Sequence, residues 1–152
     1  MINEFLTKLN GGALLTAVKP NGEINTMTVS WGGVGILWGK QVAFIFVRPQ
    51  RYTFSFTEGE CKMSLSFFDG SKKDILTFCG TKSGRDIDKI TECGLKYTLE
   101  NGYPVFEKAI YTLKLSKIYS DTIKKDCFID TDSLKWYKSN DFHTMYICEI
   151  AN

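Results

Sequence analysis

Short apolar stretches bounded by polar turn residues recur along the chain and predict β-strands. Apolar and polar residues alternate with a period of two in Asn25 to Trp31 and in Met63 to Phe67. Val42 to Val47 is apolar throughout, which is typical of a strand buried on both faces. The full set of predicted strands is Ala13 to Val18, Asn25 to Trp31, Val42 to Val47, Met63 to Phe67, Tyr111 to Ser116 and Thr144 to Ile150.

Helical patterns are fewer and shorter. Apolar residues at positions 2, 5, 6 and 9 would share one face of a short helix. The segment Ser71 to Asp74 resembles a helix cap, and Gly80 is expected to end that helix in a left-handed conformation. A further helix is expected from Asp86 to Cys93, ended by Gly94.

Two polar tetrads, Lys19 to Gly22 and Trp38 to Gln41, predict turns between strands. Strands at this short spacing, with two or three helices inserted in one stretch, predict a mainly β fold, an antiparallel barrel with helical excursions. No repeat, low-complexity tract or linker divides the 152 residues. A single domain over residues 1–152 is therefore expected.

Charge and cysteine content argue against several classes of protein. The formal net charge of +2 is spread without a basic block, which argues against nucleic-acid binding. Five cysteines without a C-x-x-C pair indicate neither a zinc site nor a disulfide framework, and fit reduced thiols in the cytoplasm. An acidic N-terminal sequence, and no apolar run of ~20 residues, predict neither export nor membrane association.

Side chains for acid–base or metal chemistry are scarce. His143 is the sole histidine, so a histidine-rich metal site is excluded, and we expect a partly exposed structural residue. No serine or cysteine has an evident base partner. Asp130 and Asp132 stand in a polar stretch where solvation or helix capping explains them. The sequence therefore predicts no metal site and no catalytic dyad.

Two loops are suited to bind an anion. Arg48-Pro49-Gln50-Arg51-Tyr52-Thr53 follows the most apolar predicted strand, and guanidinium groups bind phosphate oxygens in a forked geometry. In Gly80 to Lys89, small residues lead into a predicted helix start, where free backbone N–H groups favour an anion. Ser83 and Lys89 could complete a phosphate clamp there. A solvated turn and an ordinary inter-helix loop are the alternatives.

Gly32-Gly33-Val34-Gly35 completes neither a dinucleotide-binding motif nor a P-loop, because a strand rather than a helix is expected to follow. Its glycines permit a bulge or bend, or the approach of a flat ligand beside Trp31. Barrel curvature alone is an equally good interpretation.

Six segments become recognisable as a set: Asn25 to Gly32, Gly35 to Lys40, Val47 to Thr53, Ser66 to Phe68, Gly80 to Lys89 and Asp141 to Ile150. Together they resemble the flavoredoxin-like branch of the flavin reductase family. The motifs Arg-Pro-Gln-Arg-Tyr-Thr and Gly-Thr-x-Ser-Gly-Arg-Asp-x-Asp-Lys are the specific ones. The chain departs from the pattern at Cys148, where glycine is common, and it lacks the Thr-x-Asn-Ser signature of reductases that serve two-component monooxygenases.

The resemblance implies an FMN-binding split β-barrel, antiparallel and Greek-key-like, in a homodimer with FMN near the subunit interface. It implies that Met27 to Trp31 lies along the flavin ring, that Val47 to Thr53 meets the ribityl-phosphate tail, and that Ser83 to Lys89 helps to neutralise phosphate. The residues expected to contact FMN are Met27, Thr28, Val29, Ser30, Trp31, Val47, Arg48, Arg51, Tyr52, Thr53, Ser83, Gly84 and Lys89.

Two functions fit these expectations. In the first, NAD(P)H passes hydride to N5 of the flavin, and the protein supplies binding and orientation rather than a catalytic residue. In the second, the chain is a non-enzymatic FMN electron carrier that receives electrons from a redox partner protein. A third alternative is that the fold holds another flat ligand, such as haem or pyridoxal phosphate.

Overall fold

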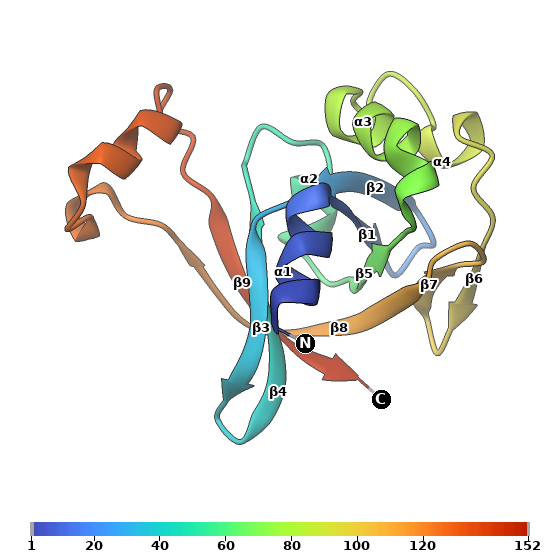
Figure 1. The fold of residues 1–152 in the computed structure, drawn as a ribbon, viewed down its shortest axis with the longest axis horizontal. Coiled ribbons are helices and arrows are strands. Elements are labelled where there is room, and N and C mark those ends of the chain that lie inside the picture. Colours follow the sequence, from blue (N-terminus) through green and yellow to red (C-terminus); the bar gives the residue numbers. More distant parts are fainter. Residues whose placement is uncertain (1, 152) are drawn as a thin grey trace.

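The computed structural model describes residues 2 to 151 (Figure 1). Its strands are β1 (Ala13–Val18), β2 (Ile24–Val29), β3 (Gly32–Leu37), β4 (Lys40–Val47), β5 (Lys62–Phe67), β6 (Tyr97–Glu100), β7 (Tyr103–Phe106), β8 (Tyr111–Thr122) and β9 (Thr144–Ala151). Its α-helices are α1 (Ile2–Gly11), α2 (Phe54–Thr57), α3 (Lys73–Thr81) and α4 (Lys89–Glu92). Short 3-10 helices are η1 (Gly70–Lys72), η2 (Lys125–Cys127) and η3 (Thr131–Trp136).

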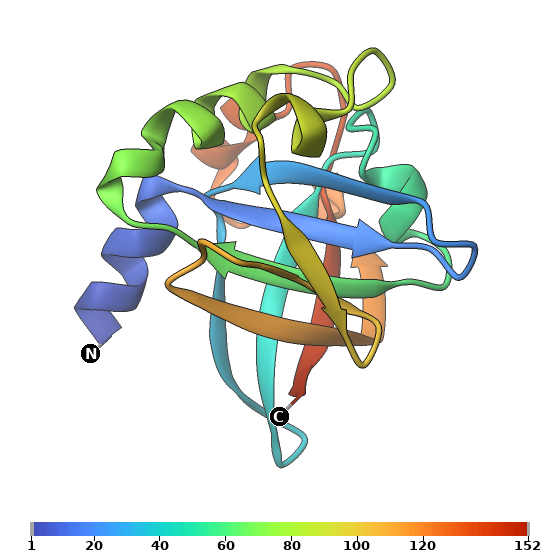
Figure 2. The same ribbon diagram turned by 90° about the vertical axis from the view of Figure 1, so that its right-hand side faces the viewer.

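Seven of the strands form one antiparallel sheet in the order β2-β1-β5-β8-β9-β4-β3. The sheet curls on itself, so that β1, β2 and β5 run across β3, β4 and β9 in Figure 2. Strand β8 belongs to both halves: its first residues pair with β5 and its later residues with β9, with a register shift between Lys117 and Tyr119. A bulge bends a strand locally, and here it lies where β8 passes from one half to the other.

Strand β1 is buried along its whole length because both of its faces are covered. Ala13, Leu15 and Ala17 point into the barrel core with residues of β4, β5 and β9. Leu14 points outward into a second cluster formed with α3, α4 and β7. The hydroxyl of Thr16, also buried, forms a 2.9 Å hydrogen bond with that of Thr26 on β2. Helix α3 can therefore rest on the outside of the barrel.

Helix α3 is fastened to β2 at two points. The hydroxyl of Thr28 donates a 2.5 Å hydrogen bond to the carbonyl of Leu76. At Gly80 a Cβ atom would lie 3.3 Å from Thr28 Cβ, tighter than ordinary van der Waals contact. The last turn of α3 is thus held close to the C-terminal half of β2.

All six predicted strands are present, and the two predicted turns join β1 to β2 and β3 to β4. The N-terminal helix is confirmed as α1, in which Leu9 is buried whereas Leu6 is exposed. The mainly β fold with a few short helices is confirmed as well. The sequence missed the β6–β7 hairpin and predicted only the first half of β8. It also took Gly32 to Gly35 for a bulge or bend, whereas they belong to strand β3.

Three helix boundaries were predicted wrongly. Ser71 does not cap α3: Asp69 caps the 3-10 helix η1, with its carboxylate accepting from the Ser71 backbone N–H, and η1 leads directly into α3. Gly80 lies inside α3, where its lack of a side chain serves the contact with Thr28. Helix α4 begins after Asp88, not at Asp86, because the Asp88 side chain accepts from the Thr91 N–H; Gly94 does follow its end, with φ of 60°.

Within residues 2 to 151, no helix is long and apolar enough to cross a membrane.

Candidate functional site

Two adjoining pockets lie where the C-terminal ends of β2 and β4 approach the end of α3. The anion pocket, of about 250 Å³, is lined by Gln50, Arg51, Tyr52, Thr53, Gly80, Thr81, Lys82, Ser83, Gly84, Arg85 and Lys89. The aromatic pocket, of about 160 Å³, is lined by Met27, Thr28, Val29, Ser30, Trp31, Phe46, Arg48, Arg51 and His143. Arg51 lines both pockets, so one elongated ligand could occupy the two together.

The anion pocket is strongly cationic. Four of its side chains are basic, namely Arg51, Lys82, Arg85 and Lys89, and among the described residues no carboxylate lines it. Hydroxyl groups on Tyr52, Thr53 and Ser83 add further hydrogen-bond donors to the same lining, whereas that of Thr81 donates to the Thr77 carbonyl (2.9 Å). Charge-assisted hydrogen bonds from such groups are what a phosphate requires.

Arg51 and Lys89 are held against the last turn of α3. The Lys89 ammonium donates to the carbonyls of Cys79 (3.2 Å) and Lys82 (3.3 Å). The Arg51 guanidinium donates to the carbonyls of Gly80 (3.1 Å) and Cys79 (3.4 Å). These carbonyls lack partners within the helix and carry its negative dipole end, so the two cations stabilise α3. Neither side chain uses all its donors in this way.

Burial lowers the pKa of both of these cations. Lys89 is only 2% exposed, and its pKa is lowered to about 8. Desolvation is the main cause, and the positive charge of Arg51 also contributes to the lowering. Desolvation also lowers the pKa of Arg51. A bound anion would favour the charged form of Lys89, so the pocket gains electrostatic interaction energy when it is filled.

The floor of the anion pocket is closely packed around Gly84. A Cβ atom there would overlap the side-chain amide of Asn25 and would lie 2.9 Å from the Tyr52 ring. Asn25 is itself fixed, because its amide donates a 2.9 Å hydrogen bond to the hydroxyl of Thr53. The guanidinium of Arg85 lies over the Tyr52 ring at 5.2 Å. The loop can approach these groups only with glycine at position 84.

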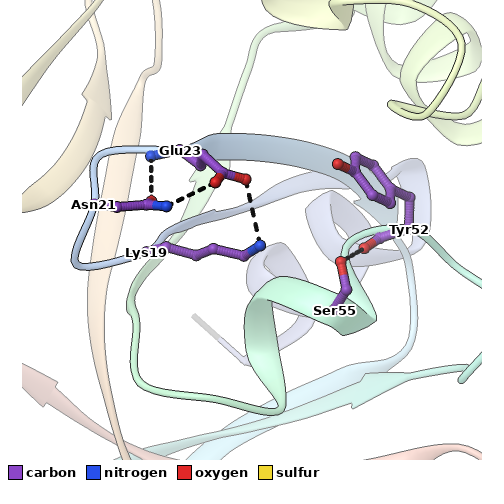
Figure 3. Close-up of polar contacts among 5 residues, drawn as sticks. All are labelled: Lys19, Asn21, Glu23, Tyr52 and Ser55. Atoms are coloured by element: carbon purple, nitrogen blue, oxygen red, sulfur yellow. Dashed lines mark hydrogen bonds and ion pairs between the residues drawn. The ribbon is translucent and has the colours of Figure 1, made fainter.

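The β1–β2 hairpin lies beside this region (Figure 3). Its carboxylate, Glu23, accepts from the Asn21 amide (2.6 Å) and the Lys19 ammonium (3.3 Å). Both bonds lower the pKa of Glu23, and the bond from Asn21 has the larger effect. Because Glu23 is bound within its own turn and does not line the anion pocket, it does not oppose an anion there.

The aromatic pocket is formed where β2 and β4 end and β9 begins. Val47 pairs with Thr144, which brings Arg48 and His143 together at one edge of the sheet. The Trp31 ring, just after β2, lies 5.4 Å from the His143 ring, and the Phe46 ring lies 6.2 Å from it. The Trp136 ring packs edge-on against Trp31 at 5.2 Å. Such a lining suits a flat aromatic ligand.

His143 corrects our expectation, because it is buried rather than partly exposed. Its Nδ1 forms a 2.7 Å hydrogen bond with the hydroxyl of Tyr137. Desolvation, followed by the charge of Arg48, lowers the pKa of His143 to about 4. The imidazole is therefore neutral at physiological pH, with one ring nitrogen as hydrogen-bond donor and the other as acceptor.

Arg48 does not form an arginine pair with Arg51. Its guanidinium binds the Asp141 carboxylate (2.5 Å) and the Trp136 carbonyl (2.9 Å), and it lies over the Tyr137 ring. Gln50 also donates to Asp141, at 2.6 Å. Arg48 thus holds the segment between β8 and β9, residues 123–143, against the site. Of the two arginines in the motif, only Arg51 lines the anion pocket.

The structure brings twelve of the thirteen predicted contact residues to these two pockets. The exception is Val47, whose side chain is fully buried in the barrel core and lines neither pocket. Met27 and Val29 also reach into that core, so they present little of their side chains to the aromatic pocket. Ser30 and Trp31 lie just beyond the end of β2 and are exposed.

Sequence reasoning missed other lining residues: Phe46, Gln50, Gly80, Thr81, Lys82, Arg85 and His143. Five of them lie inside or beside the two loops that had been singled out, so treating each loop as a whole would have found them. Phe46 was taken only as part of a buried strand, and His143 was given a structural role although it stands in the Asp141 to Ile150 segment of the resemblance.

No cluster of side chains that could hold a metal ion occurs within residues 2 to 151.

Comparison with solved structures finds the same fold in flavin proteins. An FMN-binding protein from Thermus thermophilus with bound p-hydroxybenzaldehyde is 20% identical, with a TM-score of 0.71 over 93% of this chain and 70% of that chain. Flavoredoxin of Desulfovibrio vulgaris is 17% identical, with a TM-score of 0.71 over 93% and 67% of the two chains. The styrene monooxygenase flavin reductase from Pseudomonas putida S12 is 16% identical, with a TM-score of 0.68 over 94% and 78%.

No protein-family model and no curated protein sequence matches the chain. At these low identities the structural likeness establishes the fold. The expected resemblance is confirmed at that level: the chain has the mainly β split-barrel fold of the FMN-binding, flavin reductase-like proteins and flavoredoxins.

Proposed function

We propose that this chain binds FMN, with the phosphate in the anion pocket and the isoalloxazine ring in the aromatic pocket. The observation that carries this proposal is the continuity of the two pockets through Arg51, which joins a cationic pocket to an aromatic one. A ligand with a phosphate at one end and a flat ring at the other matches that order. The proteins of the same fold named above include FMN-binding ones.

The residues present fit this cofactor. Arg51, Lys89 and Ser83 have donors left for phosphate oxygens, and Lys82 and Arg85 add exposed positive charge. The neutral His143 and the Trp31 ring offer a hydrogen bond and an aromatic surface to the ring system. Haem has no evident axial ligand here other than His143, and the unpaired lysine that pyridoxal phosphate needs is not found among the aromatic pocket residues.

We further propose that NAD(P)H reduces the bound flavin. A third pocket, of about 420 Å³, shares Arg48 with the aromatic pocket and is lined also by Lys135, Trp136, Lys138, Ser139 and Asp141. Lys135 and Lys138 could bind the pyrophosphate of a dinucleotide, and the exposed Trp136 ring could stack on its adenine. We call this the donor pocket.

In this proposal the residues of the chain bind and orient rather than react. The chemistry that FMN would supply when bound is hydride acceptance at its N5. Arg51 and Lys89 fix the phosphate end, so the ring cannot slide along the aromatic pocket. Arg48, bonded to Asp141, holds the segment between β8 and β9 that carries the donor pocket next to that ring. Trp31 and Trp136 pack against each other at the edge of the site.

An anaerobic titration tests the function. The absorbance spectrum of the purified protein first identifies FMN, haem or pyridoxal phosphate. Excess NADH or NADPH is then added without oxygen, and we expect the visible absorbance band of oxidised flavin to disappear. Lys135→Gln/Lys138→Gln should raise KM for the nucleotide and leave FMN binding unchanged. A flavin that stays oxidised with both nucleotides refutes the reductase function.

The second candidate is an electron carrier that a redox partner protein reduces. The exposed indoles of Trp31 (44%) and Trp136 (53%) favour it, because exposed aromatic rings at the mouth of a redox site are typical of protein contacts. Reduction by a low-potential iron–sulfur protein, with no response to either nicotinamide nucleotide, would support the carrier and contradict the reductase.

We also propose a homodimer. Val34, Ile36 and Trp38 project from β3 and the turn after it, and they are 44%, 72% and 60% exposed. The Tyr119 ring of β8 packs against Trp38 at 6.1 Å, which extends this apolar surface. A contiguous apolar surface along an edge strand is suited to a second copy. Sedimentation should give a dimer that Ile36→Lys converts to monomer, and a flavin-loaded monomer of the unmodified chain would refute it.

A further inference from the structure

Two cysteines lie directly beneath the anion pocket and are not used in the proposed function. Cys79 is on α3 and Cys93 follows α4, two helices that lie side by side in Figures 1 and 2. Their sulfur atoms are 4.0 Å apart. A disulfide has an S–S distance of about 2.05 Å, so an approach of roughly 2 Å would join them.

The two thiols differ in accessibility, and this difference sets the order in which a small oxidant can reach them. Cys79 is fully buried, and burial raises its pKa to about 12, so this side chain remains a thiol. Cys93 is half-buried and thus within reach of a small oxidant, although desolvation raises its pKa as well. The Lys89 ammonium lowers the pKa of both, in opposition to burial. An accessible cysteine beside a second, resolving cysteine is the arrangement of redox-sensitive pairs.

The backbone of Cys79 connects this pair to the anion pocket. Its carbonyl oxygen accepts hydrogen bonds from both the buried Lys89 and the half-buried Arg51 of the pocket. On the other side of the pair, the backbone N–H of Cys93 donates to the carbonyl of Lys89. Drawing the two sulfurs together therefore displaces groups that position both cations.

We propose that a peroxide oxidises Cys79 and Cys93 to a reversible disulfide, and that this bond displaces Lys89 and Arg51 and weakens FMN binding. The Cys93 sulfur takes one oxygen from hydrogen peroxide, which forms a sulfenic acid and releases water. The Cys79 thiol then loses its proton as its sulfur attacks the Cys93 sulfur, the S–O bond breaks, and the hydroxyl takes up that proton and leaves as a second water. Two electrons pass from the two sulfurs to the peroxide, and a dithiol reductant reverses the change.

The experiment uses Cys127→Ser protein, because Cys127 is exposed and would otherwise form disulfides between molecules. After treatment with hydrogen peroxide we expect a protein that has lost two hydrogens in mass, with one cross-linked peptide pair containing Cys79 and Cys93. Dithiothreitol should restore the original mass. The dissociation constant for FMN should rise at least about tenfold on oxidation, as for one lost charge-assisted contact.

Cys93→Ser in the same background is the matched control, since it removes the pair with a change of one atom and Cys93 lines neither pocket. It should bind FMN normally and show no peroxide-dependent loss of affinity. A cross-link through other cysteines, a sulfinic acid without a cross-link, or a Cys79–Cys93 disulfide with unchanged FMN affinity overturns the inference. The expected effect on FMN binding rests on the proposed function. Mass mapping needs no FMN and tests disulfide formation by itself. If the reduced protein did not bind FMN, the proposed function would fail, and the disulfide would still be tested.

Discussion

The anion pocket and the aromatic pocket meet at Arg51 but are built from different parts of the chain. The anion pocket comes from two continuous loops, residues 50–53 and 80–85, with Lys89. The aromatic pocket combines residues 27–31 at the end of β2 with Phe46 and Arg48 at the end of β4, Arg51, and His143 just before β9. Charge dominates the first and ring packing the second. Loops of polar residues can therefore be recognised from sequence, whereas a packed aromatic wall depends on the pairing of distant strands.

The two pockets also treat their ionisable residues differently. In the anion pocket, the buried Lys89 and the half-buried Arg51 donate to carbonyls at the end of α3, and the Lys89 pKa of about 8 leaves its side chain mostly charged at neutral pH. In the aromatic pocket, His143 has no carboxylate partner and burial keeps it neutral. One pocket is thus prepared for a charge and the other for a ring. Substitutions in the two pockets should therefore separate the binding of a charged group from the binding of a ring.

The largest effect is expected from the buried cations. Lys89→Ala or Arg51→Ala should each weaken FMN binding by about 1.5–3 kcal/mol, because each removes a charge-assisted contact to the phosphate. Titration calorimetry with FMN measures this. Lys82→Ala, which removes an exposed cation from the same pocket, should have a smaller effect, and normal FMN retention in both buried-cation variants would show that the phosphate lies elsewhere.

Acid should destabilise the fold through the aromatic pocket. The pKa of His143 is about 4 when folded and 6.5 in the unfolded chain, so the unfolded state binds the proton more tightly and stability falls as pH drops through this window. Between pH 7 and pH 5 the loss due to His143 should be about 2 kcal/mol. Urea unfolding at the two pH values measures it, and His143→Gln should lack this part of the pH dependence.

Alkaline pH should act on the anion pocket instead. Lys89 has a pKa of about 8 before the ligand binds, and a bound phosphate raises it. FMN affinity should therefore be constant below pH 8 and then fall by up to about tenfold per pH unit until the pKa of the complex is reached. Lys89→Met should bind weakly at all pH values without this slope; a slope that persists in the variant would assign it to another group.

The smallest effect is expected from the ring side. Trp31→Ala should weaken FMN binding by about 1 kcal/mol, the usual size of an aromatic contact. Its loss should be nearly equal for FMN and for riboflavin, which has the same ring and no phosphate. Equilibrium fluorescence titration of both ligands measures this, and a loss confined to FMN would contradict a ring contact.

Much of the fold could be predicted because apolar and polar residues alternate regularly along several strands, and because turn residues follow the strand ends. The β6–β7 hairpin escaped prediction because β7 is only four residues long and contains Pro104, which argues against a strand. Only the first half of β8 was predicted, because its later residues are mostly exposed and do not alternate between apolar and polar. Gly80 was taken for a helix end because a left-handed glycine and a close-contact glycine look alike in sequence.

The site was predicted as far as its motifs are local. Arg51, Ser83 and Lys89 belong to loops with evident anion-binding composition, and the structure assembles them in one pocket. The bond between Arg48 and Asp141 joins residues 93 positions apart, and the burial of His143 depends on Tyr137 and on the β4–β9 pairing. Neither can be obtained without knowing which strands are neighbours.

The central claim is that the anion pocket binds the phosphate of FMN, and the most direct measurement compares the affinities of FMN and riboflavin for the same protein. We expect FMN to bind the unmodified protein at least about a hundredfold more tightly, since more than one charge-assisted contact is involved. In Lys89→Ala and Arg51→Ala this ratio should fall towards one. Equal affinity for FMN and riboflavin in the unmodified protein would contradict the account.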